Sequence, residues 1–332
     1  MALSAVMLLA TTACSSITPN EGSTNTVISG TDASTAPATP LSTASIVLKV
    51  SHPDNDTSML ENTWNCYART FKNSLEIYSN GEMTCEIFPN DQLGDLTSCM
   101  EQCSQGVVDV CLSPATGNLA SWIPNINVFD IPYIVENMDA CNLVCEGDIY
   151  RELSDNLDEV AHMRLLSMFQ TGFRNIDTWT APVRSVDDLA GMKLRIQEID
   201  AHTAMASAWK AVPTISFSEL YSAATTGVID GFENCNYTLF MKNLYETVNY
   251  ITETQHLANV VCTLISSTVH DGLTPEQQEA VNRAAADARR ATIGVVAANN
   301  VNVVTKLQNK GVEIITLSDE EKGAFKEACY EP

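Results

Sequence analysis

One long predicted helix limits the possible folds more than any other feature of this sequence. Thr274 and Pro275, with Gln277 three residues after the threonine, form a strong helix start with a cap and a capping box. No further proline occurs before the last residue, so the helix is expected to run to Asn309, ahead of Gly311. A helix of about 35 residues is roughly 50 Å long. Because this exceeds the diameter of one lobe, we expect the helix to brace two lobes.

The first half of the chain alternates strand and helix signals. Short runs of aliphatic residues predict strands over 46–50, 83–88 and 107–112, and helices are expected between them over 58–78 and 96–105. Farther along, strands are expected over 163–169 and 193–197, a one-turn helix from 185, a helix over 218–226 and a final short helix from 318. The β-α-β-α-β order is typical of an α/β lobe with a largely parallel sheet.

The size and the net charge of the chain limit the classes of protein to which it can belong. With residues 1–45 set aside, 287 of the 332 residues remain, which is enough for two lobes with separate cores. The formal charge is −23, from 18 Lys and Arg against 41 Asp and Glu. Nucleic-acid binding requires a clustered basic face, and attachment to an anionic membrane requires basic residues too. The composition argues against both and favours a soluble, monomeric body.

The N-terminus predicts export. Residues 1–13 are apolar or small and uncharged, too few to cross a bilayer, and are typical of the end of a secretory signal. The run from Leu8 to Cys14 resembles a bacterial lipoprotein processing site, although Thr11 stands where an aliphatic residue is usual. We therefore expect a signal over 1–14 and lipidation of Cys14, which would anchor the protein on the outer face of the cytoplasmic membrane or in the periplasm. An ordinary signal with an incidental cysteine is the alternative. The Ser/Thr-rich residues 15–45 are expected to form a flexible tether.

Ten cysteines remain after Cys14. Cys99 and Cys103, like Cys141 and Cys145, are four residues apart in helical segments, which does not suit a disulfide within either pair. We expect most of the ten to act as small buried hydrophobic residues, and leave open one or two bridges between neighbouring helices. The five histidines have no metal-ligand spacing, and we predict neither a metal nor a cofactor.

Three motifs in the second half bring together side chains that suit a carboxylate. They are Gly172-Phe173-Arg174, the run from Gly191 to Arg195, and the run from Val228 to Asn234. A guanidinium presents a planar fork of donors that matches the two oxygens of a carboxylate. In so acidic a chain, these arginines indicate a site for an organic anion.

The order and spacing of these motifs resemble the solute-binding receptors of the tripartite ATP-independent periplasmic (TRAP) transporters, the DctP-like family. The resemblance extends from Ile46 to Cys329. It is carried by the three motifs above together with runs in both halves, namely Val50–Pro53, Ser79–Gly81, Ile87–Gly94, Gly106–Asp109, Asp130–Tyr133, Glu219–Tyr221 and Gly311–Glu313. The resemblance implies the two-lobed α/β fold of class II periplasmic binding proteins, with a hinge crossed more than once and a long helix bridging both lobes. Lobe I would comprise 46–171 and about 260–298, and lobe II 172–259 and about 299–332.

The resemblance also implies a binding site and partners. The carboxylate would be held by Arg195, with Arg174 and Asn234 as further donors and Phe217 as an aromatic wall. The first lobe would contribute residues near His52 and the segment from Ser113 to Asn118, and Phe232 would offer a further aromatic face. The protein would deliver a small organic acid to TRAP membrane subunits. Cys235 stands where proline commonly follows the asparagine, which bears on the orientation of Asn234.

Other functions remain open at this point. An enzyme is the first alternative, although the sequence has no nucleophile elbow, zinc-protease motif, phosphate loop or dinucleotide fingerprint. The second alternative is an organic-anion receptor that serves an ABC importer or a sensor kinase. The identity of the organic acid is also open, because the ligands of such receptors share a carboxylate and little else.

Overall fold

The computed structural model describes residues 44–197, 199–214 and 220–330, and these are organised around a mixed sheet. The predicted signal, the predicted lipidation site Cys14 and Phe217 lie outside the described residues. The strand order is β2-β1-β3-β8-β4-β7-β5-β6, and β9 pairs with β8. The strands are β1 (Ile46–Ser51), β2 (Met83–Phe88), β3 (Val110–Ala115), β4 (Met163–Thr178), β5 (Lys193–Arg195), β6 (Val212–Thr214), β7 (Gly231–Cys235), β8 (Tyr250–Ser266) and β9 (Glu313–Ile315).

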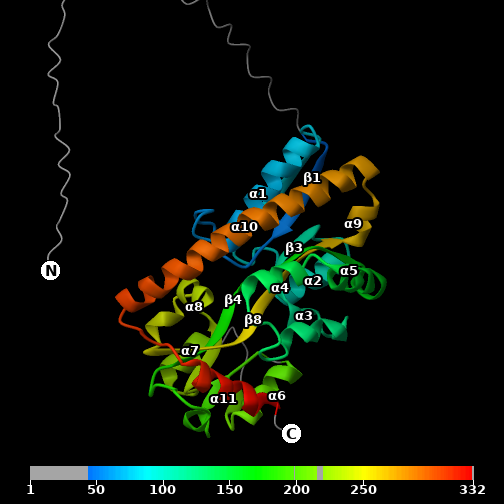
Figure 1. The fold of residues 1–332 in the computed structure, drawn as a ribbon. Coiled ribbons are helices and arrows are strands. Elements are labelled where there is room, and N and C mark those ends of the chain that lie inside the picture. The colour runs from blue at the N-terminus through cyan, green and yellow to red at the C-terminus, as the bar shows by residue number, and fades with distance from the viewer. Residues whose placement is uncertain (1–43, 198, 215–219, 331–332) are drawn as a thin grey trace, which may run out of the picture. The chain divides into compact units, whose positions relative to one another are not determined.

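Helices cover the sheet and connect its strands (Figure 1). The helices are α1 (Thr63–Tyr78), α2 (Leu96–Ser104), α3 (Thr116–Leu119), α4 (Met138–Val144), α5 (Asp148–Ala161), α6 (Asp200–Ala208), α7 (Leu220–Thr226), α8 (Asn236–Met241), α9 (Ser267–Asp271), α10 (Pro275–Asn309) and α11 (Asp319–Tyr330), with 3₁₀ turns η1 (Pro124–Asp130), η2 (Val186–Leu189) and η4 (Leu244–Glu246). The first helix starts later than the expected residue 58, because the Asn62 side chain accepts hydrogen bonds from the N–H groups of Trp64 and Asn65 and caps α1 there.

The parallel α/β arrangement predicted for the first half is confirmed. Strand β1 pairs in parallel with β2 on one side and with β3 on the other, so that Val50 lies opposite both Ile87 and Val110. Val50 is fully buried, as expected for a central strand covered on both faces.

Two long antiparallel strands, β4 and β8, connect the two halves of the sheet. Each pairs along most of its length with the other, and β4 continues well beyond Phe169, where the sequence predicts its end. The register shifts between Gln170 and Phe173, where Gly172 has a φ of +136° that disfavours any residue with a Cβ. These strands carry the hinge between the lobes.

The hydrophobic core is divided into four clusters, two on each side of this hinge. The clusters around Phe71 and Leu119 belong to the first lobe, and those around Trp209 and Leu239 belong to the second. Along β8, Leu257 packs in the second lobe and its neighbour Ala258 in the first. Because one sheet runs through both lobes, the described residues form a single compact unit.

The long helix predicted from Thr274 is confirmed over its full length. In α10, Thr274 and Gln277 form the reciprocal capping box, and the helix ends at Asn309. Its first half packs in the first lobe through small residues such as Ala284, while Val303 and Leu307 pack in the second lobe. Figure 1 shows α10 running beside α1 at one end and reaching α8 at the other. The helix therefore braces both lobes.

The described cysteines are all unpaired thiols. All are buried except Cys329, which is half-buried. Six of them lie in one first-lobe cluster, namely Cys99, Cys103, Cys111, Cys141, Cys145 and Cys262. Their use as small apolar core residues is confirmed, and burial raises the pKa of the Cys85 and Cys235 thiols to about 12.

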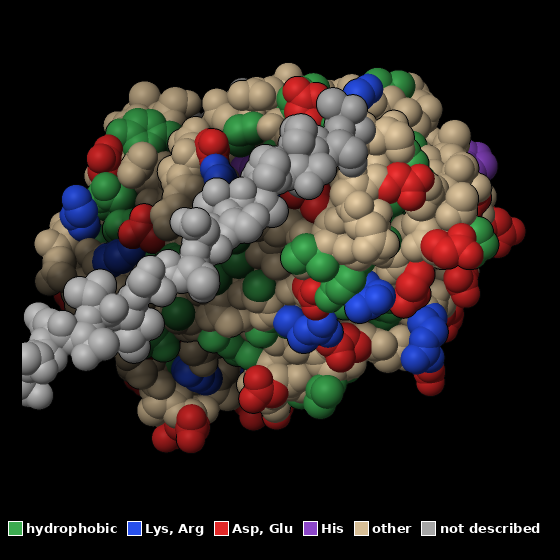
Figure 2. Space-filling model, turned by 90° about the horizontal axis from the view of Figure 1, so that it is seen from above, with side chains coloured by type: hydrophobic (Ala, Val, Ile, Leu, Met, Phe, Trp, Pro, Cys, Tyr) green, Lys and Arg blue, Asp and Glu red, His purple; other side chains and the backbone are tan. Residues whose placement is uncertain are grey.

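The surface matches the acidic composition. On the face seen in Figure 2, Asp and Glu side chains are dispersed, with Lys and Arg interspersed among them, and the basic residues do not form a continuous patch. In the part of the chain that the structure describes, no helix has the length and apolar character that crossing a membrane requires.

Candidate ligand-binding site

A cavity of about 690 Å³ lies between the two lobes, and we call it the interlobe cavity. Its lining includes three residues expected from the second-half motifs, Arg174, Arg195 and Asn234, and two from the first lobe, Ser113 and Asn118. Residues predicted from motifs far apart in the chain therefore line the same cavity. In the described ranges, no group of three His, Cys, Asp or Glu side chains is arranged to hold a metal ion.

Arg195 is placed by the end of a short parallel strand. It is the last residue of β5, which pairs in parallel with β7 so that Arg195 lies opposite Phe232. Asn234 is two residues farther along β7, so both side chains lie near the carboxyl edge of these strands. Arg195 lines the cavity and is only 5% exposed. A guanidinium so withdrawn from water interacts more strongly with an anion than a surface arginine does.

The structure defines the orientation of Asn234. Its Oδ1 accepts a hydrogen bond of 2.8 Å from the backbone N–H of Cys235. The amide nitrogen is the donor that Asn234 can offer to a carboxylate, while its oxygen keeps one lone pair. The backbone N–H of Cys235, a donor that a proline at this position would lack, fixes this orientation.

Arg174 has a different environment from Arg195. Its Nε bonds Oε2 of Glu233, and its Nη2 donates to Oε1 and to the backbone oxygen of Glu233, both at 2.8 Å. Its Nη1 donates to Oδ1 of Asn259 at 3.1 Å. Although Arg174 lines the cavity, its guanidinium is bound to protein groups on every nitrogen. Its use as a ligand donor remains a prediction.

Glu233 is the centre of a buried ionic cluster behind the cavity. In addition to Arg174, it faces His256 Nε2 at 3.3 Å and His202 Nδ1 at 3.8 Å, and His202 Nε2 lies 3.3 Å from Asp130. Burial disfavours the charge of Glu233, but Arg174 and the two imidazoles outweigh it and hold the pKa of the carboxyl well below its usual value. Burial likewise lowers the pKa of His256, whereas Asp130 and Glu233 overcome burial and raise the pKa of His202.

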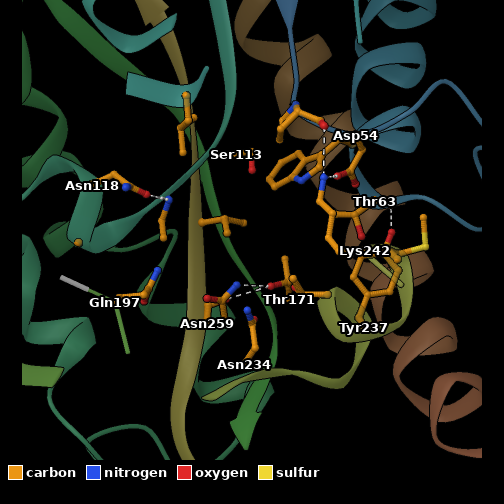
Figure 3. Close-up of a pocket in the computed structure, with 18 of the residues that line it drawn as sticks. Asp54, Thr63, Ser113, Asn118, Thr171, Gln197, Asn234, Tyr237, Lys242 and Asn259 are labelled. Atoms are coloured by element: carbon orange, nitrogen blue, oxygen red, sulfur yellow. Dashed lines mark hydrogen bonds and ion pairs between the residues drawn. The ribbon is translucent and has the colours of Figure 1, made fainter. Parts of the chain in front are cut away.

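Several amide and hydroxyl side chains complete the wall, and the sequence did not reveal most of them. Asn259 donates to Thr171 Oγ1 at 2.7 Å, and both lie beside Asn234 (Figure 3). Ser113 sits at an irregularity of β3 with a φ of +92°, and Gln197 faces the cavity from the second lobe. Asn259 and Gln197 stand in no motif, so no sequence signal distinguished them.

Two expected site residues lie elsewhere in the structure. Phe232 is fully buried in the second-lobe core, 6.5 Å from the ring of Trp179, because its side chain packs with the aliphatic cluster around Leu239. His52 is 1% exposed and is not among the cavity residues, and burial lowers its pKa to about 4. The structure therefore places both side chains outside the lining of the interlobe cavity, and their contact with a ligand stays a prediction.

The lobes also touch each other directly at the edge of the cavity. Lys242 of the second lobe lies 3.0 Å from Oδ1 of Asp54 in the first (Figure 3). The backbone N–H of Thr63 donates to the Tyr237 hydroxyl at 2.9 Å. On another side, Gly117 packs against Ile199. The cavity is therefore bounded by interlobe contacts on more than one side.

Replacing Gly117 with alanine is expected to hold the lobes apart and weaken ligand binding by roughly tenfold or more, because overpacking costs about 1–3 kcal/mol. A Cβ on Gly117 would lie 1.9 Å from Cδ1 of Ile199. Calorimetry with a carboxylate ligand would measure the affinity. Gly323→Ala is the matched control, since nothing lies within 4 Å of its added Cβ. Unchanged affinity in Gly117→Ala would show that the contact between residue 117 and Ile199 does not limit closure of the lobes over the ligand.

Comparisons with known proteins agree with this geometry. The family described as bacterial extracellular solute-binding protein, family 7, matches residues 56–331. A solute-binding protein of Roseobacter denitrificans is 29% identical over 81% of this chain and 81% of its own. The C4-dicarboxylate-binding periplasmic protein DctP of Rhodobacter capsulatus is 28% identical over 91% of this chain and 89% of its own.

A solved structure of a TRAP solute-binding protein has the same fold as this chain. A TRAP periplasmic solute-binding protein of Roseobacter denitrificans with bound L-galactonate has a TM-score of 0.78 and 27% identity, covering 87% of this chain and 93% of that chain. The fold with its two lobes, the interlobe cavity and the family match over most of the sequence lead to one conclusion. This chain belongs to the bacterial extracellular solute-binding proteins of family 7, the DctP family.

Proposed function

We propose that this protein is an extracytoplasmic receptor that binds a small organic acid between its lobes and delivers it to a TRAP-type secondary transporter. The observation that carries the proposal is the placement of Arg195, which is 5% exposed and lines the interlobe cavity beside Asn234. No catalytic role is proposed, because the family consists of solute-binding receptors.

The chemistry of this site suits a carboxylate. The fork of Arg195 would bind the two carboxylate oxygens, and the amide nitrogen of Asn234 would donate a further hydrogen bond. Charge-assisted hydrogen bonds contribute about 1.5–3 kcal/mol net. Arg174 would contribute through Asn259, which it holds in place. L-Galactonate and C4-dicarboxylates, which the similar proteins bind, share the carboxylate group.

The N-terminus completes the proposal. Cys14 would carry a lipid that anchors the protein on the outer face of the cytoplasmic membrane, and residues 15–45 would act as a tether. The body would act as a monomer, which the net charge of −23 favours. Metabolic labelling with a radioactive fatty acid should label the wild-type chain and leave Cys14→Ser unlabelled.

Transport provides the functional test. The protein and TRAP membrane subunits from the same organism would be reconstituted in liposomes, and uptake of organic acids identified by thermal shift would be followed. A bound ligand raises the apparent stability by RT ln(1 + [L]/Kd), which makes such a screen sensitive. We expect uptake that requires this protein. Purification of the protein with an ABC importer or a sensor kinase, and no uptake through the TRAP subunits, would contradict the assignment.

A further inference from the structure

Helix α8 begins directly after β7 and carries contacts that cross to the first lobe. Asn234, whose amide is proposed to bind the ligand, lies two residues before α8 begins at Asn236. Leu239 of α8 is fully buried in a core cluster of the second lobe, so the helix belongs to that lobe. Tyr237 lies in its first turn, and Lys242 is the residue at which it ends. Both side chains contact the first lobe (Figure 3).

Lys242 forms an ion pair that is shielded from water on its acidic side. Its Nζ lies 3.0 Å from Oδ1 of Asp54 and donates a hydrogen bond of 3.3 Å to the backbone oxygen of Pro53. The side chain of Asp54 is 9% exposed and that of Lys242 is 35% exposed. Because water and salt screen such a pair less than one on the surface, it stabilises the contact between the lobes more than an exposed pair would.

The first lobe holds Asp54 in position for this pair. Oδ2 of Asp54 accepts a hydrogen bond of 2.9 Å from Nδ2 of Asn62, which is fully buried. Oδ1 of Asn62 in turn accepts the N–H groups of Trp64 and Asn65 at the start of α1. Asp54 is therefore fixed by its own lobe, and only the Lys242 side chain has to be ordered when the pair forms.

Tyr237 makes a second contact between the lobes, at the start of α1. Asn62 caps two N–H groups of this helix, and the N–H of Thr63 donates instead to the Tyr237 hydroxyl at 2.9 Å. The hydroxyl donates in turn to the backbone oxygen of Glu61 at 3.2 Å. Tyr237 is 8% exposed, so little water is available to replace its hydroxyl. A helix end of one lobe is therefore capped by a side chain of the other.

These contacts join the protein to itself, although Tyr237, Lys242 and Asp54 also line the interlobe cavity. Arg195 is 5% exposed in that cavity, so an acid bound to it can enter and leave only when the lobes separate about β4 and β8. Separation breaks both contacts, because each of them joins one lobe to the other.

We propose that Tyr237 and Lys242 form a latch on α8, which holds the lobes together over a bound acid and sets how long the acid stays bound. This inference rests on the proposed function, since it concerns the release of the acid assigned to Arg195. Neither contact involves the ligand, so the latch should slow the release of different acids by a similar factor. Loss of a shielded charge pair between two surfaces acts mainly on the rate of dissociation.

Single-molecule fluorescence energy transfer between the lobes tests the latch in the full chain. The dyes are attached through noncanonical amino acids at Ile77 of the first lobe and Val228 of the second, both more than half exposed. We expect Lys242→Met to lower the ratio of joined to separated lobes about tenfold, both without an acid and with an excess of succinate or L-galactonate. Tyr237→Phe keeps the ring and loses the hydroxyl, and should lower the ratio about three- to tenfold. A ratio that both variants leave unchanged under all these conditions overturns the latch.

Release rates separate a latch from a direct contact with the ligand. Where succinate or L-galactonate joins the lobes, stopped-flow measurement should show release from Lys242→Met about tenfold faster, with association changed by less than about threefold. Asp54→Asn should have the same effect, and the double variant should release the acid no faster than either single variant, because both changes remove one contact. Slower association with unchanged release, or effects that add in the double variant, overturns the latch.

Two control variants and one comparison complete the design. Arg184→Met removes a positive charge from the exposed pair with Glu313 within the second lobe, and should change neither the ratio nor the release rate. Lys242→Arg keeps the charge and should retain most of the ratio. Joining of the lobes by an acid that is equal in wild type and Lys242→Met overturns the latch alone. A latch effect in a protein whose lobes no acid of the thermal-shift screen brings together would leave the latch standing and contradict the proposed function.

Discussion

Alanine in place of Arg195 is expected to weaken binding of the cognate acid by about 2–5 kcal/mol, or roughly 30- to 5,000-fold in Kd. Arg195 is 5% exposed at the end of β5, so the carboxylate of a bound ligand would lose its charged partner in a place that water reaches poorly. The loss therefore includes the cost of leaving an unpaired charge in the cavity. Isothermal titration calorimetry on wild type and variant measures the effect.

Two control variants show whether a loss of affinity is specific to the guanidinium of Arg195. Arg195→Lys keeps the charge but loses the fork, so it should recover only part of the affinity. Arg184→Ala removes an arginine whose side chain is 58% exposed and which pairs with Glu313, so it should leave binding unchanged. Wild-type affinity in Arg195→Ala, with a folded protein, would remove Arg195 from the site.

Glutamine in place of Glu233 is expected to lower the free energy of unfolding by about 3–5 kcal/mol, because it leaves the buried Arg174 without its counter-charge. Arg174 is 3% exposed and Glu233 is fully buried, so water cannot replace the lost partner. Urea denaturation followed by circular dichroism measures the change. Glu313→Gln, which breaks the exposed pair with Arg184, is the control and should cost less than about 1 kcal/mol.

The pH dependence gives this prediction a second test. The pKa of Glu233 is lower in the folded protein than in the unfolded chain, so its stabilising contribution is present above the usual value of 4.5 and is lost as the pH falls toward the folded value. The stability difference between wild type and Glu233→Gln should therefore shrink below about pH 4.5. A difference that stays constant down to acid denaturation would show that Glu233 is not an ionised partner of Arg174.

Local signals explain how much of the fold could be predicted. The start of α10 is set by Thr274, Pro275 and Gln277, which act on their own backbone, and β2 matches the predicted 83–88 because its apolar run is bounded by turns. The hinge strand β8 was missed. Its residues Tyr250–Ser266 include many polar side chains, and the strand exists because β4, β3 and β9 pair with it. Such pairing depends on segments distant in sequence.

The difference between local signals and contacts of distant segments also explains which parts of the binding site could be predicted. Arg195 and Asn234 lie in motifs whose spacing already identified them, and the structure brings them to one cavity. The resemblance implies that Arg174 is a further donor to the carboxylate, but Glu233 and Asn259, far along the chain, engage its guanidinium. The ion pair between Lys242 and Asp54 likewise could not be predicted from the sequence, because it joins residues of different lobes across the cavity.

The central claim is that an organic acid binds between the lobes through Arg195, and a crystal structure of the complex tests it most directly. The protein would be crystallised with the acid that gives the largest thermal shift. The account predicts a carboxylate in the interlobe cavity with both oxygens within hydrogen-bond distance of the Arg195 guanidinium and Asn234 beside it. A ligand that lies outside this cavity, or that turns an uncharged end toward Arg195, would contradict the account.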